Sequence, residues 1–224
     1  FVWVKAGTAS MSLVQSNYKG TPAYRAALLT RGSERADRYF VLRDTILCYS
    51  SLGLEPLYFR KGSRHDKQYT VDEVFYSYAN NKPTLKQHRQ RRDGEHEWKT
   101  TTFNECVYDM LNIVLRARSF NPEGWKSGNT ISFTIADGRH IQKALLRYNG
   151  KKVIKADNGK KYRCLELSYL EQEEKKNKEI IRFFVTDDSN HVPIRLDMFL
   201  KFGSAKAFLV GMKGVKNAIA SEVQ

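Results

Sequence analysis

Residues 180–213 read IIRFFVTDDSNHVPIRLDMFLKFGSAKAFLVGMK, and the predicted fold rests first on the pattern of this stretch. Apolar residues recur at every second position on both sides of a turn-forming cluster, Asp187-Asp188-Ser189-Asn190. A period of two is typical of a β-strand with one face in a core, so the stretch predicts a β-hairpin. The residues expected on its core face are Ile181, Phe183, Val185, Val192, Ile194, Leu196, Met198 and Leu200.

Similar runs fill most of the chain, and short turn segments separate them. Asx-Gly pairs stand between neighbouring runs at 93–94, 137–138, 149–150 and 158–159, and Arg43-Asp44 is a further candidate for a tight turn. Glycine accepts a positive φ without steric cost, so each Asx-Gly pair predicts a hairpin turn, and together they predict an antiparallel meander. The expected strands are 2–14, 24–30, 39–42, 45–51, 57–61, 68–78, 84–91, 95–103, 130–136, 140–148, 151–156, 161–170 and 205–212.

One segment, residues 107–118, has the periodicity of an α-helix. Its apolar residues recur at intervals of three and four, which places them on one helical face. Asn104 precedes it as the expected N-cap, and Asn121-Pro122 closes it. The apolar face comprises Val107, Met110, Leu111, Val114 and Leu115.

These elements predict a mainly β fold for a single domain, residues 1–224. A sheet of many strands curls because its twist accumulates, so we expect one large antiparallel meander sheet curled into a half-barrel (an unclosed barrel) around the central helix. The helix can cover the concave side. Aromatic residues such as Tyr49, Tyr58 and Phe75 are spread over many strands, and an exposed apolar concavity could instead take an acyl chain. Its candidate lining on the helix is Met110, Leu111, Val114 and Leu115.

The composition of the chain limits the kinds of partner and the cellular environment that are expected for the protein. The formal net charge is +14, from 38 Lys and Arg against 24 Asp and Glu, which permits a polyanionic partner or simply a soluble, charged surface. No apolar run is long enough to span a membrane. Cys48, Cys106 and Cys164 are too few for a disulfide framework; we expect small buried hydrophobes, with one long-range disulfide as the alternative. The chain opens at Phe1 in a strand-like pattern, which would fit a removed export signal, an expression boundary or preceding disordered residues.

The densest basic run lies around residues 86–92, and Trp98 follows across the predicted turn. Basic side chains beside an aromatic ring could grip an anion, whereas the alternative is a solvated edge hairpin that its charges protect from aggregation. The candidate anion-binding residues are Lys86, Arg89, Arg91, Arg92 and Lys99.

His88 and His96 are the two histidines that the same hairpin would bring together. With Glu95 and Glu97 beside them, a zinc or acid–base site is conceivable. The surrounding lysines and arginines would repel a cation, and no third, distant ligand stands out. The chain also lacks a Gly-x-Ser-x-Gly elbow, a P-loop and a dinucleotide fingerprint, so no cofactor is expected.

Several motifs resemble the DUF3108 family. Asp187-Asp188, Val192-Pro193-Ile194-Arg195 and Gly203-Ser204-Ala205-Lys206-Ala207 are similar to its C-terminal signature. The first strand at residues 3–9 and the helix at 108–116 resemble its other segments, although Asn112 replaces a small residue and Val114 and Leu115 replace aromatics. Residues 128–138 resemble its hairpin after the helix.

This resemblance implies an exported protein of Gram-negative bacteria with a meander half-barrel similar to YmcC-like and LolA-like folds, located in the periplasm or at the outer membrane. It implies no activity and supplies no catalytic residues. We therefore expect a non-enzymatic protein that binds an amphipathic or anionic envelope component: a lipid, a lipoprotein acyl chain or a polysaccharide. The alternatives are a basic polyanion or protein-interaction module, with nucleic acid disfavoured as partner, and a metal-dependent enzyme using His88 and His96.

Overall fold

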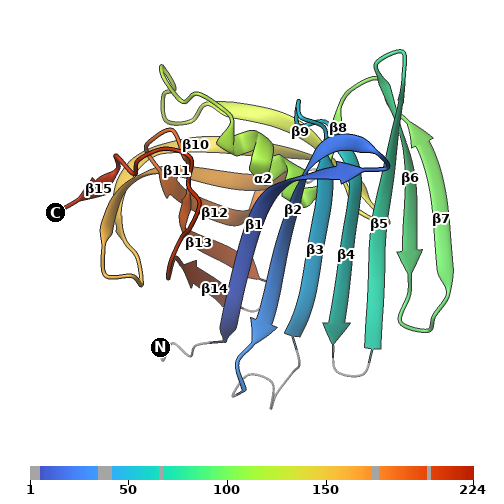
Figure 1. The fold of residues 1–224 in the computed structure, drawn as a ribbon, viewed down its shortest axis with the longest axis horizontal. Helices are drawn as coiled ribbons and strands as arrows, with labels where there is room; N and C mark the ends of the chain where they lie inside the picture. The colour runs from blue at the N-terminus through green and yellow to red at the C-terminus, as the bar shows by residue number, and fades with distance from the viewer. Residues whose placement is uncertain (1–5, 35–41, 66–67, 173–176, 201–202) are drawn as a thin grey trace. The chain divides into compact units, whose positions relative to one another are not determined.

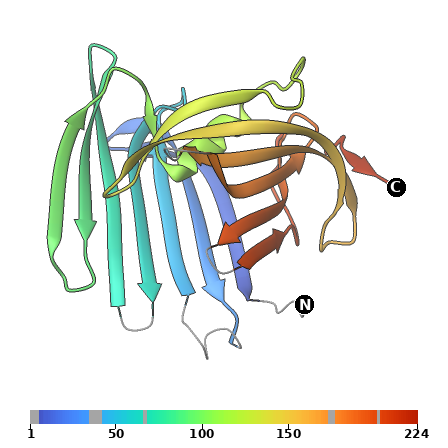
Figure 2. The ribbon, with the colours of Figure 1, turned by 180° about the vertical axis from the view of Figure 1, so that it is seen from behind.

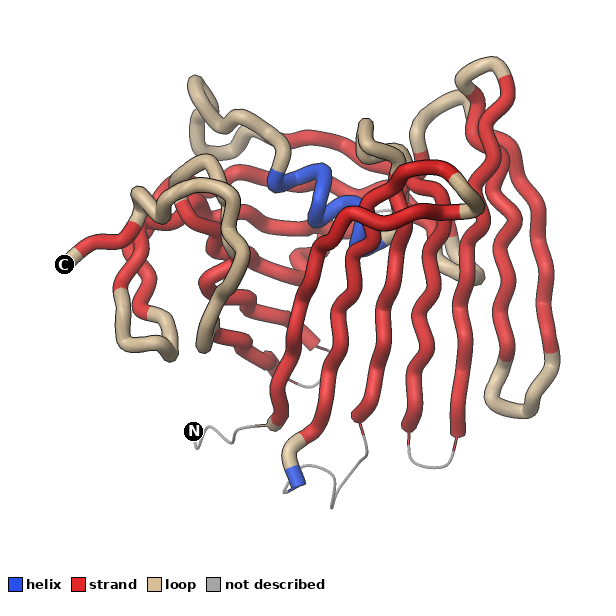
Figure 3. Tube along the Cα trace, in the orientation of Figure 1, coloured by secondary structure: helices blue, strands red, loops and turns tan. Residues whose placement is uncertain are grey.

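The computed structural model describes residues 6–34, 42–65, 68–172, 177–200 and 203–224, and most of them lie in β-strands (Figure 3). Consecutive strands are neighbours in the first sheet (Figure 1). Its strands are β1 (Gly7–Tyr18), β2 (Thr21–Gly32), β3 (Leu42–Ser50), β4 (Pro56–His65), β5 (Gln68–Ala79), β6 (Lys82–Gln90) and β7 (His96–Thr102).

The remaining strands form a second sheet, which Figure 2 shows from behind. In sheet order they are β14 (Gly203–Phe208), β13 (Pro193–Leu200), β12 (Asn177–Thr186), β11 (Lys161–Gln172), β10 (Ile141–Lys155), β9 (Thr130–Ala136) and β8 (Val107–Tyr108), and β15 (Glu222–Val223) pairs with β11. The mainly β, antiparallel fold with one helix, α2 (Met110–Arg118), and no closed barrel is confirmed for the described residues. The strands divide over two sheets instead of one because β8 leaves the meander and pairs in parallel with β9.

The chain forms two compact units. The first contains residues 1–117 and 134–141, and the second contains residues 118–133 and 142–224. The single domain expected from the sequence stays a prediction.

In the first unit, α2 packs on one face of the seven-stranded sheet. Ala26, Cys48, Phe59 and Val74 lie opposite one another across β2 to β5, and all are fully buried. Leu111 and Leu115 of α2 join the same cluster. Because side chains alternate along a strand, this row defines the helix side of the sheet, and the neighbouring residues point to the opposite side.

The helix begins later than the sequence suggested, and Asp109 caps it instead of Asn104. One carboxylate oxygen of Asp109 accepts hydrogen bonds from the backbone N–H groups of Leu111 (2.9 Å) and Asn112 (2.8 Å). Residues 107–108, predicted as helix, pair with β9 as β8. The cap was misassigned because both Asn104 and Asp109 are good capping residues, and pairing with β9 selects the second.

Two predicted turns are also wrong. Arg43-Asp44 lies inside β3, opposite Arg64 and Ser63 of β4. Residues 149–150 lie inside β10, where the register with β11 shifts between Tyr148 and Gly150. Gly150 has a φ of 117°, so glycine here serves a β-bulge, which needs the same backbone freedom as a turn.

The predicted hairpin at 180–213 is present as β12, β13 and β14. Ile181 lies opposite Met198 and Phe183 opposite Leu196, so they share a face as predicted, but all four are only half-buried, and Phe184 is the buried ring of β12. A register shift after Phe184 instead lets Ile194 pack in a cluster with Phe184. In the turn, a carboxylate oxygen of Asp188 accepts hydrogen bonds from the Asn190 N–H (3.0 Å) and the Thr186 hydroxyl (2.9 Å).

The three cysteines are free. Cys48 and Cys164 are buried, as expected, whereas Cys106 is exposed. Burial raises the pKa of the Cys164 thiol to about 12, so this thiol stays protonated. No helix of the described residues is long and apolar enough to cross a membrane.

Candidate functional site

An aromatic row crosses the side of the seven-stranded sheet that faces away from α2. Tyr49, Tyr58 and Phe75 are direct cross-strand neighbours on β3, β4 and β5, one residue out of phase with the buried row. Tyr18 of β1 lies next to Tyr49, with ring centroids 5.1 Å apart, and Trp98 of β7 lies 6.3 Å from Phe75. The centroids of Tyr49 and Tyr58 are 6.4 Å apart, and those of Tyr58 and Phe75 are 5.1 Å apart. The five rings therefore form one continuous row from β1 to β7.

The rings of this row are partly open to solvent. Tyr18, Tyr49, Tyr58 and Phe75 are half-buried, and Trp98 keeps 53% of its surface exposed. Side-by-side rings on one sheet face stabilise the sheet itself, by about 0.2–1 kcal/mol for each cross-strand pair. The parts of these rings that stay exposed are also available to a ligand.

The same side of the sheet is strongly cationic. Among the described strand residues, one carboxylate lies there, Glu73, whereas Asp44, Asp72 and Glu97 point to the helix side. The positively charged residues at the corresponding positions are Arg25, Arg31, Arg43, Arg60, Arg64, Lys82 and Lys86. We call these residues and the aromatic row together the cationic aromatic face.

The hydrogen bonds of Glu73 tie the middle of this face together. One of its oxygens accepts a hydrogen bond from the Tyr58 hydroxyl, and the other lies 2.7 Å from Nδ1 of His88. Arg60 Nε lies 3.8 Å from the first oxygen. Burial and the bond to Glu73 raise the pKa of Tyr58, so its hydroxyl remains a donor. Glu73 is therefore held by its own neighbours, and it offsets few of the surrounding positive charges.

Lys86 brings a positive charge into contact with the aromatic row of this face. Its ammonium group lies 4.6 Å from the centroid of the Trp98 ring, within range of a cation–π interaction. Lys86 also lies directly opposite Phe75. An anionic group near Lys86 would thus meet an exposed indole ring at the same point.

His88 and His96 lie side by side, as the predicted hairpin required. Their ring nitrogens take part in hydrogen bonds within the protein. Nε2 of His88 lies 2.8 Å from Nδ1 of His96, and Nδ1 of His88 contacts Glu73. A metal ion bound at His88 would have to displace one of these hydrogen bonds. The described side chains contain no cluster of three or more His, Cys, Asp or Glu placed to hold a metal ion.

The structure separates the five candidate anion-binding residues. Lys86 lies on the cationic aromatic face, whereas Arg89 and Lys99 occupy positions on the helix side, where Arg89 lies 3.8 Å from Asp72. Arg92 is exposed in the turn. Arg91 is surrounded by carboxylates, with contacts of 3.8, 3.5 and 3.2 Å to Asp93, Glu95 and Glu97. The run is contiguous in sequence, but strand alternation splits it in space.

Two of the four residues predicted to line an apolar cavity are core residues. Leu111 and Leu115 are 3% and 4% exposed and pack against the seven-stranded sheet. Val114 is half-buried, and Met110 is 41% exposed. An acyl chain could reach the leucines only by separating the helix from the sheet.

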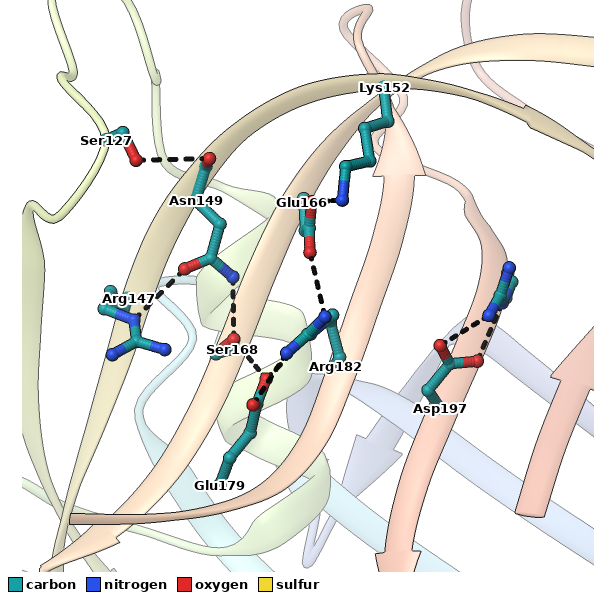
Figure 4. A network of polar contacts seen from close by, with 10 residues as sticks. Ser127, Arg147, Asn149, Lys152, Glu166, Ser168, Glu179, Arg182 and Asp197 are labelled. Carbon is teal, nitrogen blue, oxygen red and sulfur yellow. Dashed lines mark hydrogen bonds and ion pairs between the residues drawn. The ribbon is translucent and has the colours of Figure 1, made fainter. Parts of the chain in front are cut away.

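The second unit has a separate polar network on β10, β11 and β12 (Figure 4). Arg182 donates to both oxygens of Glu179 at 2.8 Å and lies 3.3 Å from Glu166. Lys152 contacts the other oxygen of Glu166 at 2.8 Å. The side-chain amide of Asn149 donates to Ser168, which donates to Glu179. These groups satisfy one another, which is typical of a structural network.

Comparisons with known proteins give the family of the chain and a solved structure of similar fold. The sequence profile of a family described as "Protein of unknown function (DUF3108)" matches residues 1–210. The chain belongs to the DUF3108 family. No curated protein matched this DUF3108 chain. Among solved structures it is similar to a "Beta-barrel-like Protein of Domain of Unknown Function DUF1849 from Brucella abortus", with 11% identity, a TM-score of 0.51, and coverage of 89% of this chain and 86% of the other. At that identity the similarity shows the fold alone.

Proposed function

We propose that this protein is a non-enzymatic, exported binding protein, and that its cationic aromatic face binds an acidic polysaccharide of the cell envelope. The observation that carries the proposal is the continuous aromatic row on a side of the sheet with seven cationic positions and one carboxylate. The family resemblance described above is what supports export to the periplasm or the outer membrane in this proposal.

The chemistry of an acidic polysaccharide suits both parts of the face. Sugar rings present C–H groups with slight positive charge, which the negative faces and hydroxyls of aromatic residues attract. Carboxylate, phosphate or sulfate groups along the chain would pair with Arg25, Arg60 and Lys86. An open sheet face accommodates an extended chain better than a small molecule, which needs a concave site. A lipid ligand is less well supported, because Leu111 and Leu115 lie in the core.

The proposal is tested by retention on immobilised heparin, a sulfated polysaccharide, with neutral dextran as the control matrix. Arg25→Gln combined with Lys86→Gln removes two charges from the face. Arg92→Gln combined with Lys99→Gln removes two charges from the turn and the helix side, so it is the matched control. We expect the first pair to elute at clearly lower salt and the control pair to elute close to the unaltered protein.

Trp98→Ala separates the aromatic from the electrostatic contribution. We expect weaker binding at every salt concentration, by roughly 1–3 kcal/mol, with an unchanged slope against salt because no charge is removed. Equal losses in both double variants would show that net charge alone drives retention. That outcome, or no retention of the unaltered protein, contradicts the proposal.

A further inference from the structure

Strand β1 is a long edge strand without the features that usually protect one. It pairs with β2 along its whole length, from Gly7 opposite Gly32 to Tyr18 opposite Thr21, and it is the first strand in its sheet. Its twelve residues, GTASMSLVQSNY, include no Lys, Arg, Asp, Glu, His or Pro. Edge strands commonly carry charges or proline, because an unprotected edge offers its backbone to another strand.

The other terminal strands of the described sheets differ from β1. β7 carries His96, Glu97 and Lys99, and β14 carries Lys206. β8 has two residues. Among these four strands, β1 alone is both long and uncharged.

Backbone alternation identifies the free groups of β1. The carbonyl of Ala6 accepts a hydrogen bond from the Ser33 N–H at 2.8 Å, so the backbone groups of Ala6 point toward β2. In an antiparallel ladder, successive residues direct both groups alternately toward and away from the partner. The residues whose N–H and C=O groups point outward are therefore Gly7, Ala9, Met11, Leu13, Gln15 and Asn17.

We propose that β1 is a self-association edge, on which two copies of this chain pair their β1 strands antiparallel about a two-fold axis near Ser12. The chain carries a net charge of +14, so most contacts between two copies bring like charges together. At an uncharged edge of twelve residues, two copies can meet without bringing charged side chains of the paired strands into contact. An acidic partner, in contrast, would find no charge on β1 to select it.

The two-fold axis fixes the register. It pairs Met11 with Leu13, Ala9 with Gln15 and Gly7 with Asn17 of the other copy, and these are residues with outward-pointing groups. Ser12 faces its own counterpart. The axis is perpendicular to the sheet, so both copies direct their cationic aromatic faces to the same side.

The first test is molar mass in solution by light scattering over a range of protein concentrations. We expect the unaltered protein to reach the mass of a dimer. Gln15→Pro removes an outward N–H and no bond to β2, and we expect it to raise the dimer dissociation constant about tenfold or more. Gln15→Ala, the control, should leave that constant unchanged. A monomeric mass throughout, or a dimer that tolerates Gln15→Pro, overturns the proposal.

Cross-linking tests the register independently of whether the proline variant folds. In a Cys106→Ser background, Ser12→Cys should form a covalent dimer under mild oxidation, because opposed residues of a non-hydrogen-bonded pair lie close enough for a disulfide. Ser10→Cys faces Val14 of the other copy and should remain uncross-linked. Equal cross-linking of both variants, or of neither, contradicts the paired register, as does capture of an extended peptide by a protein that stays monomeric.

Discussion

Nε2 of His88 lies 2.8 Å from Nδ1 of His96, and the two rings stack with their centroids 5.0 Å apart. Nδ1 of His88 lies 2.7 Å from a Glu73 oxygen. A carboxylate only accepts, so His88 donates from Nδ1, and in the neutral ring its Nε2 accepts the proton of His96 Nδ1. The pair is therefore a directed chain of hydrogen bonds from His96 through His88 to Glu73.

We expect neutral His88 to hold its proton on Nδ1, which is measurable from imidazole nitrogen shifts by NMR. His191 is an internal reference, because its Nδ1 lies 2.7 Å from the Arg118 carbonyl and must donate as well. His140 is a second reference for an exposed ring: 60% of its side chain is exposed, and its Nδ1 lies 3.6 Å from Asp137. A proton on Nε2 instead of Nδ1 of neutral His88 would contradict the hydrogen bond that Nδ1 donates to Glu73.

The fold was predictable where local pattern and pairing agree. Alternation located β9, for example, because Ile131, Phe133 and Ile135 follow a strict period of two. It failed at residues 149–150, because a bulge and a hairpin turn both use an Asx-Gly pair. It failed again at Asp109, where long-range pairing of β8 with β9 decides where the helix begins.

The candidate site was less accessible to sequence reasoning, because its residues come from different strands. Tyr18 and Trp98 are far apart in the chain, and register alone brings them into one row. The sequence shows these aromatic residues only as spread over many strands, and the strand register places them on the side of the sheet that faces away from α2. Contiguity in sequence was misleading for the basic run, since consecutive residues of a strand point to opposite sides.

Asp109 should make stability depend on pH. Its carboxyl is buried, and burial raises its pKa from 3.8 to about 6 despite hydrogen bonds from Asn112 and Leu111. Between these values the folded state holds more protons than the unfolded state, so the free energy of unfolding falls as pH rises from about 4 to 6. The fall amounts to roughly 3 kcal/mol if the whole shift is realised.

The measurement is chemical denaturation of the unaltered protein and Asp109→Asn across this pH window. Asparagine keeps an oxygen for the backbone N–H groups of the first helical turn, and it does not titrate. We therefore expect the variant to lose this part of the pH dependence. An identical pH profile in both proteins would mean that Asp109 ionises in the folded state as it does in the unfolded chain.

Gly138 should tolerate no side chain. A Cβ atom there would lie 2.5 Å from the backbone oxygen of His88 and 2.7 Å from Cα of Asp72, so the turn between β9 and β10 approaches β5 and β6 closely. We expect Gly138→Ala to lower the free energy of unfolding by about 1–3 kcal/mol. At Gly53, the nearest atom to a Cβ is Ser51 Oγ at 3.6 Å, so Gly53→Ala is the control and should change stability by less than about 0.5 kcal/mol. Equal effects of the two substitutions would contradict the close approach.

Arg182 and Lys152 both contact Glu166, but replacing Arg182 should lower the free energy of unfolding more than replacing Lys152. Glu166 is 4% exposed, and Arg182 also holds Glu179 with two hydrogen bonds. Arg182→Met removes both hydrogen bonds from a cation to Glu179 and leaves Glu166 with Lys152 alone, so we expect a loss of about 3 kcal/mol in the free energy of unfolding. Lys152 has 56% of its side chain exposed, and Lys152→Met leaves Arg182 in place, so its loss should stay below about 1 kcal/mol.

The unaltered protein and Arg182→Met should differ in their free energy of unfolding. The pH dependence of this difference shows whether Arg182 acts through its charge or through its packing. The Arg182 guanidinium lowers the pKa of Glu179, so this ion pair stabilises the fold above the unfolded-state pKa of the carboxyl, and the stabilisation is lost as pH falls through the folded-state pKa. The difference in free energy of unfolding between the unaltered protein and Arg182→Met, measured by urea denaturation, should therefore become smaller as the pH is lowered. A difference that stays constant with pH would show that Arg182 acts through the packing of its aliphatic chain and its contact with the Phe199 ring, 5.6 Å from the guanidinium.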